Sequence, residues 1–255
     1  MHTEHKTTAD VILPESPACP LNVVLGGTPL LGRLTGIGRY TYELARALVA
    51  SQIVDDLKLW GDLSFLDAGM LKRGDPTSEG PAGLADKKNR GRSGSLAVSA
   101  RAFASRSYYA SMVYQFVSGA MAERRLRPLA DSHLYHSPNF IMPHFDGARV
   151  ITIHDLSTIR FPQFHRKQMV VLCQGGIHSA IEGKAHVITD SFHVRDELVN
   201  DFGVESSRIS TVHLAPDPRC RPRHESECRH ALDALGLSHK AFFLSVGTIE
   251  PRKNL

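Results

Sequence analysis

The chain has 255 residues, of which 42% are hydrophobic and 22% are charged, and its formal net charge is +4. These values are ordinary for a soluble globular protein. No stretch reaches the roughly 18 apolar residues that a transmembrane helix needs. Residues 1–20 lack the apolar core of a signal peptide, so we expect a disordered lead-in and a cytoplasmic protein.

The first elements alternate between strand and helix. Residues 21–27 form an apolar run that ends in glycines and predicts a buried strand. Residues 35–49 then predict a helix, with Ile37, Tyr40, Leu44 and Leu48 at helical spacing on one face. Residues 56–60 predict a second strand. This order indicates a parallel α/β sheet with flanking helices, a Rossmann-like fold.

The same alternation continues after residues 72–95, which are rich in Gly, Pro, Ser and charge and predict a mobile loop. A further helix is expected at 96–127, with Phe103, Met112, Phe116 and Met121 among its buried candidates. Helices are also expected at 166–181 and 194–202, the last capped by Ser191. Further strands are expected at 133–136, 149–153, 185–189 and 209–214.

A proline-rich segment, 216–223, predicts a linker. A helix at 225–235 and a strand at 242–246 follow it. We therefore predict a lead-in at 1–20, a Rossmann-like domain at 21–222 and an incomplete start of a second domain at 223–255, because one helix and one strand cannot bury a core.

The cysteines and the basic residues are weakly informative. Cys19, Cys173, Cys220 and Cys228 show no CxxC spacing, so we expect reduced thiols and no metal site. Basic residues cluster at 87–92 and 124–127. Nucleic acid, an anionic membrane surface or a phosphorylated substrate would each suit such clusters, as would solvated surface.

Gly36 and Gly38 open the predicted helix that follows the first strand. Glycines at a helix N-terminus let an anionic ligand approach the backbone amides. A dinucleotide site would place GxGxxG directly after the strand, whereas here Thr41 occupies the third glycine position. A phosphate or sugar ligand therefore fits better than NAD.

His154 and Asp155 follow the predicted strand at 149–153. Ligands of open α/β sheets bind at the carboxyl ends of the strands, where a histidine can donate to a sugar hydroxyl or carry a proton. Two other interpretations stay open. One is a structural histidine in a loop, and the other is an HD-type metal phosphohydrolase.

Arg252 and Lys253 follow the predicted strand at 242–246 and Gly247. A lysine ammonium and a planar guanidinium can both bind phosphate oxygens. A solvated turn is the alternative interpretation.

In this order the motifs resemble the retaining GT-B glycosyltransferases of family 4, in particular bacterial mannosyltransferase-like enzymes of polysaccharide and lipopolysaccharide assembly. The resemblance covers residues 22–255 and is carried by residues 35–44, 150–157, 160–162, 187–191, 212–217 and 244–255.

The resemblance implies a role for each motif. Gly36 and Gly38 would face the interdomain cleft, and His154, with Asp155 beside it, would contact the transferred sugar. Arg252 and Lys253 would hold the nucleotide diphosphate. The donor would be a nucleotide-diphosphate sugar, with mannose as one candidate. No cofactor or metal is implied, because basic groups and helix dipoles offset the leaving charge.

The resemblance further implies a saccharide or lipid-linked acceptor. Because residues 124–127 form a positive helix end, we also expect peripheral contact with an anionic membrane, at the inner face of the plasma membrane. No nucleic acid partner is expected. The donor-binding domain of the family would begin near Phe242. We therefore expect a truncated enzyme that is inactive alone, unless the missing domain is supplied in trans. A non-catalytic carbohydrate- or partner-binding module and a NAD-binding Rossmann protein are the alternatives.

Overall fold

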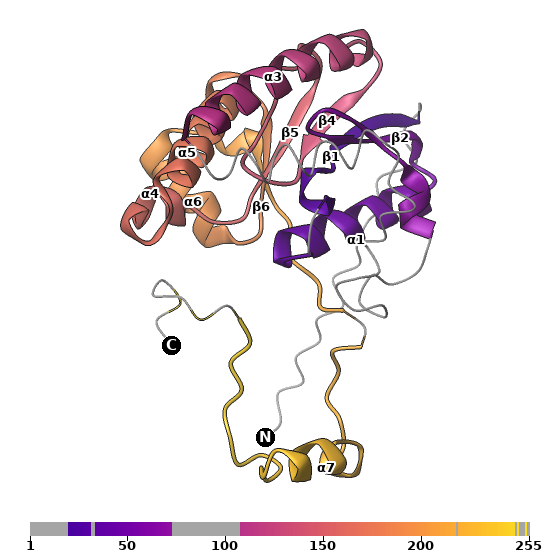
Figure 1. The fold of residues 1–255 in the computed structure, drawn as a ribbon, viewed down its shortest axis with the longest axis vertical. Helices are drawn as coiled ribbons and strands as arrows, with labels where there is room; N and C mark the ends of the chain where they lie inside the picture. Colours follow the sequence, from indigo (N-terminus) through magenta and orange to yellow (C-terminus); the bar gives the residue numbers. More distant parts are fainter. Residues whose placement is uncertain are drawn as a thin grey trace, which may run out of the picture.

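The computed structural model describes residues 20–31, 34–72, 108–217, 219–247, 249 and 253. Its centre is a seven-stranded sheet with the order β3-β2-β1-β4-β5-β6-β7 (Figure 1). All neighbouring strands are parallel except β2 and β3, which form an antiparallel edge. The predicted Rossmann-like α/β sheet is therefore confirmed. The strands are β1 (Leu21–Gly26), β2 (Val54–Gly61), β3 (Ser64–Leu66), β4 (Leu134–Ser137), β5 (Arg149–Ile153), β6 (His186–Thr189) and β7 (Ile209–Thr211).

Helices connect most of the parallel strands. The α-helices are α1 (Gly36–Ala50), α3 (Tyr108–Leu126), α4 (Ser157–Arg160), α5 (Lys167–Glu182), α6 (Phe192–Phe202) and α7 (Glu225–Ala234). The 3-10 helices are η1 (Thr28–Leu30), η2 (Ala68–Lys72), η3 (Arg127–Leu129), η4 (Pro162–Phe164) and η5 (Ser206–Arg208). The predicted cap of α6 is confirmed, because the Val194 amide donates to Ser191 Oγ at 3.3 Å.

Neighbouring side chains of β1 point to opposite faces of the sheet. Val24 packs with residues of α3, whereas the next residue, Leu25, packs with residues of α1. Successive side chains of a strand point to opposite faces. Helices α1 and α3 therefore cover opposite faces of the sheet.

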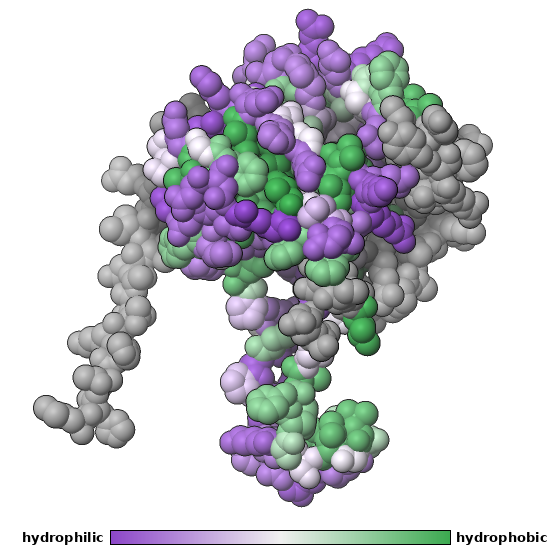
Figure 2. Space-filling view, turned by 90° about the vertical axis from the view of Figure 1, so that its left-hand side faces the viewer, coloured by the Kyte–Doolittle hydropathy of each residue, from purple (hydrophilic) through white to green (hydrophobic). Residues whose placement is uncertain are grey.

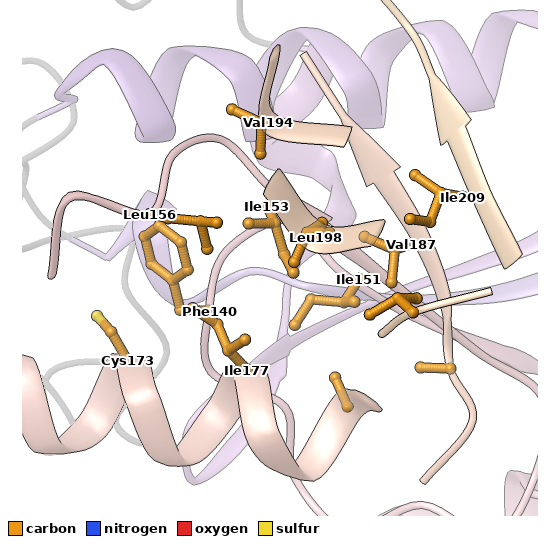
Figure 3. Packing of buried hydrophobic residues seen from close by; sticks show 13 residues of the cluster. Phe140, Ile151, Ile153, Leu156, Cys173, Ile177, Val187, Val194, Leu198 and Ile209 are labelled. Atoms are coloured by element: carbon orange, nitrogen blue, oxygen red, sulfur yellow. The ribbon is translucent and has the colours of Figure 1, made fainter. Parts of the chain in front are cut away.

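Besides the two clusters that pack on either side of β1, an apolar cluster forms around β5, β6 and β7 (Figure 3). Ile151 and Ile153 of β5 are fully buried there against Cys173 and Ile177 of α5. Gly176 lets α5 approach the chain closely, because a Cβ at this position would overlap the carbonyl oxygen of Phe140. This contact fixes the segment between β4 and β5, which later contributes to the site.

The predicted buried faces of two helices need correction. In α1 the fully buried positions are Gly38, Thr41, Tyr42 and Ala45, so the packed face is rotated from the predicted stripe, of which Leu44 and Leu48 pack at the margin. In α3, Phe116 is 79% exposed, and the buried positions are Ala122 and Leu126.

The prediction of a strand at 242–246 is wrong. These residues are irregular, and Phe243, Leu244 and Val246 are largely exposed. The preceding helix, α7, forms as predicted but buries none of its residues. It lies apart from the sheet in Figure 1. A strand needs a neighbour to satisfy its backbone groups, and nothing in the described part of the chain pairs with this segment. The predicted lead-in at 1–20, except residue 20, and the predicted loop at 72–95, except Lys72 at the end of η2, lie outside the described residues.

Candidate functional site

The parallel strands β1, β4, β5 and β6 all end at one edge of the sheet. His154 follows β5 and Asp190 follows β6. The register pairs Ile153 with Thr189, so the next residues of the two strands lie beside each other. Ligands of open α/β sheets bind at this carboxyl edge, and we therefore take it as the candidate site.

His154 is held on three sides at this edge. Its Nδ1 lies 2.7 Å from Asp190 Oδ2, and its Nε2 lies 3.1 Å from the carbonyl oxygen of Pro138. The ring of Tyr40, from α1, meets the imidazole edge to face, with centroids 4.8 Å apart and planes at 88°. The side chain is 13% exposed, so the ring is fixed but reachable.

Both partners of the imidazole are hydrogen-bond acceptors. A neutral imidazole has one N–H donor, whereas the protonated ring has two. The observed contacts therefore suit the imidazolium form, with Nδ1 donating to Asp190 and Nε2 donating to Pro138. In the neutral form only one of the two contacts can persist as a hydrogen bond.

A buried polar chain lies beneath this histidine. The Tyr40 hydroxyl is 3.1 Å from Thr152 Oγ1, and that oxygen is 2.9 Å from Nε2 of His136. Burial lowers the pKa of His136 to about 4, so the imidazole is neutral at pH 7. Burial also raises the pKa of Tyr40, and the negative charge of Asp190 adds to that rise. This chain ties α1 to the centre of the sheet.

The two glycines of α1 behave differently. A Cβ at Gly38 would lie 2.9 Å from Leu34 Cδ2 and 3.0 Å from the Pro29 carbonyl oxygen, so Gly38 is needed for close packing. A Cβ at Gly36 would meet no atom of the described residues within 4 Å. Thr35 precedes the helix without a side-chain cap. The first turn of α1 is therefore open at Gly36.

An ion pair joins α1 to the segment after β7. Arg39 Nη2 lies 2.7 Å from Asp217 Oδ2 and 3.0 Å from Glu43 Oε1. Arg219 also donates to Asp217 from its side chain and its backbone amide. Hydrogen bonds from Arg219, together with the charge of Arg39, hold the pKa of Asp217 well below its usual range. Asp217 is thereby ionised and anchored.

Two other predicted site residues, Asp155 and Lys253, are exposed where the structure describes them. Asp155 is exposed, and its Oδ1 accepts from the Ser157 amide at 2.9 Å, at the start of α4. Lys253 is exposed, and Arg252 lies outside the described residues. None of the described contacts joins Lys253 to His154.

Sequence reasoning missed Asp190, Tyr40 and Thr152 as parts of the site. A usable signal existed for Asp190, because it follows its strand as His154 follows the neighbouring one. Tyr40 and Thr152 required the three-dimensional placement of α1 over β5.

The described residues contain no group of three or more His, Cys, Asp or Glu side chains that could hold a metal ion. Within the same residues, no helix has both the length and the apolar character needed to cross a membrane.

The chain resembles one curated protein over most of its length. It is 30% identical over 235 residues to the O-antigen chain mannosyltransferase B of Escherichia coli. The chain is similar to a mannosyltransferase. The alignment covers 92% of this chain but 58% of the relative, so the chain spans less than two thirds of that protein's length. No family model matches the sequence.

Proposed function

We propose that the chain contributes the acceptor-side domain of a glycosyltransferase that transfers a hexose, with mannose as the first candidate. The similarity to a mannosyltransferase over 92% of the chain carries the proposal. The setting of His154 supports the proposal, because a constrained imidazole at the carboxyl edge of the sheet suits recognition of sugar hydroxyls.

The donor in this proposal is a nucleotide-diphosphate sugar, and the reaction retains the anomeric configuration in a GT-B enzyme of family 4. The acceptor hydroxyl attacks the anomeric carbon on the face from which the diphosphate leaves, and a departing phosphate oxygen takes the hydroxyl proton. Arg252 and Lys253 would offset charge on the diphosphate, and Gly36 would leave room for the ligand beside α1.

His154 would present its Nε2 atom to a sugar oxygen. Because Nε2 faces the Pro138 carbonyl oxygen at 3.1 Å, an incoming hydroxyl would replace that carbonyl as the partner. The exchange conserves one hydrogen bond, so its net cost is small compared with leaving a buried donor without a partner.

Transfer by a hybrid protein tests the proposal. Residues 20–217 replace the matching part of the Escherichia coli relative, and mannose incorporation into a saccharide acceptor is measured. We expect transfer, and a loss of about 100-fold or more in the His154→Ala hybrid. A folded hybrid that binds the donor but transfers no more sugar than its His154→Ala variant would contradict the proposal and favour a non-catalytic binding module.

Helix α3 supports a further part of the proposal, peripheral contact with an anionic membrane. Val113, Phe116 and Val117 are exposed on α3, and Arg124 and Arg125 lie in its last turn. Apolar and basic side chains on one helix suit an anionic lipid surface, where each cation contributes about 1 kcal/mol.

Co-sedimentation of the chain with vesicles checks this contact. We expect binding to vesicles that contain anionic lipid, and weaker binding by Phe116→Ser and by Arg124→Ala. Val49→Ser, which alters an exposed valine of α1, is the matched control and should bind normally. Equal binding to neutral and anionic vesicles would contradict the electrostatic part.

A further inference from the structure

The position of Asp190 suggests a role beyond the loop in which it lies. Its backbone is already held by other groups, because the Val212 amide donates to the Thr189 carbonyl at 2.8 Å and His213 Nδ1 contacts the Asp190 carbonyl oxygen at 2.9 Å. The side chain is therefore not needed to fix the backbone after β6. It is directed instead at His154.

The carboxylate uses one of its two oxygens for this contact. Asp190 Oδ2 lies 2.7 Å from His154 Nδ1, whereas Oδ1 is buried and has no hydrogen-bond partner among the described residues. The side chain is 18% exposed. A buried carboxylate oxygen without a partner is costly, so the favourable contact of Oδ2 with the imidazole is the main compensation.

We propose that Asp190 is a positioning residue that keeps a proton on Nδ1 of His154 and so turns Nε2 toward the ligand. A carboxylate bonded to Nδ1 of an imidazole sets both its tautomer and its orientation. The ring of Tyr40 restricts rotation of the imidazole from the other side. A role of Asp190 in sugar transfer rests on the proposed function.

The two forms of the ring then differ at a single atom. When the imidazole is protonated, Nε2 donates to the Pro138 carbonyl oxygen or to a sugar oxygen that replaces it. When the imidazole is neutral, Asp190 keeps the proton on Nδ1, and Nε2 becomes an acceptor that the carbonyl cannot satisfy. A ligand hydroxyl can then donate to Nε2. In both forms Nε2 is the atom offered to the ligand.

Nitrogen NMR of the imidazole rings tests this inference on the full chain, without any sugar. The chain is labelled with ¹⁵N at histidine, and the signals of His154 are assigned by their loss in His154→Gln. We expect Nδ1 of the unaltered protein to resonate as a protonated nitrogen. In Asp190→Asn the signal should move toward that of a bare nitrogen. Asp190→Glu, which keeps the negative charge, should restore the protonated-nitrogen signal of Nδ1 in part.

Asp196→Asn is the matched control, because Asp196 is an exposed carboxylate of α6 that pairs with Arg195. It should leave the His154 signals unchanged. If the role of Asp190 were merely structural, Asp190→Asn would leave them unchanged as well. An unaltered protein with a bare Nδ1 on His154 would overturn the inference, even if Asp190→Asn failed to fold. So would a folded Asp190→Asn protein with an unchanged Nδ1 signal. Titration of the same samples with saccharide examines the proposed function separately, so either idea can fail alone.

Discussion

His136 shows how the site depends on neutral buried groups. The imidazole is 7% exposed, and its Nε2 lies 2.9 Å from Thr152 Oγ1. Burial lowers its pKa from 6.5 to about 4. The unfolded chain therefore binds a proton at this residue at a higher pH than the folded chain does.

This difference predicts a pH window for stability. The contribution of His136 is fully present above about pH 6.5 and is lost as the pH falls toward 4, a total of about 3 kcal/mol. Urea unfolding measured from pH 7.5 to 4 checks this. His136→Gln should show a shallower loss over that window, because glutamine does not titrate. An identical pH profile for both proteins would show that the buried imidazole does not cause the loss.

Helix α5 depends on a residue without a side chain. At Gly176 an added Cβ would overlap the Phe140 carbonyl oxygen, whereas at the adjacent Gly175 an added Cβ would meet no atom within 4 Å in the part of the chain that the structure describes. We expect Gly176→Ala to lower the free energy of unfolding by about 1–3 kcal/mol, as overpacking does. Gly175→Ala should leave it unchanged or raise it by up to about 1 kcal/mol, because alanine favours helix.

Chemical denaturation of the two variants measures this difference. Equal stabilities would show that α5 does not rest against the segment after β4. Because Pro138 lies in the same segment, Gly176→Ala should also alter the His154 Nε2 environment in the imidazole NMR spectrum.

The elements differ in how far the sequence predicts them. Helices α1, α5 and α6 and the parallel strands have strong periodicity and local signals such as Ser191, so their existence could be predicted. The short strand β3 was missed, because its pairing with β2 depends on a turn at Asp62 and on register, not on hydrophobic pattern. The buried face of α1 was misplaced because Gly38, Thr41 and Ala45 lie beside Tyr42 on its packed surface, and small or polar residues leave no apolar stripe in the sequence.

The site could be predicted in part. The position of His154 after β5 was evident from the sequence, because an apolar strand precedes it. Its partners were not, since contacts among Tyr40, His154 and Asp190 join three segments far apart in the chain. Only the register of β5 with β6 and the placement of α1 bring them together.

At the scale of the whole molecule, the sheet and its helices form one body, from which the segment that carries α7 extends (Figure 1). Figure 2 shows the side that bears α4, α5 and α6, where apolar residues lie within a polar rim. The strand predicted at 242–246 failed because a strand depends on neighbours that local sequence does not describe. The chain aligns with 58% of its mannosyltransferase relative, so the activity of a whole enzyme stays a proposal.

Binding of saccharide at the carboxyl edge tests the central claim most directly. The ¹⁵N-labelled full chain is titrated with a mannose-terminated oligosaccharide up to about 10 mM, a range that covers weak affinities. We predict saturable shifts of amide signals around Gly36, His154 and Asp190, and their loss in a folded His154→Ala protein. The absence of saturable shifts, or shifts confined to residues away from this edge, would contradict the account.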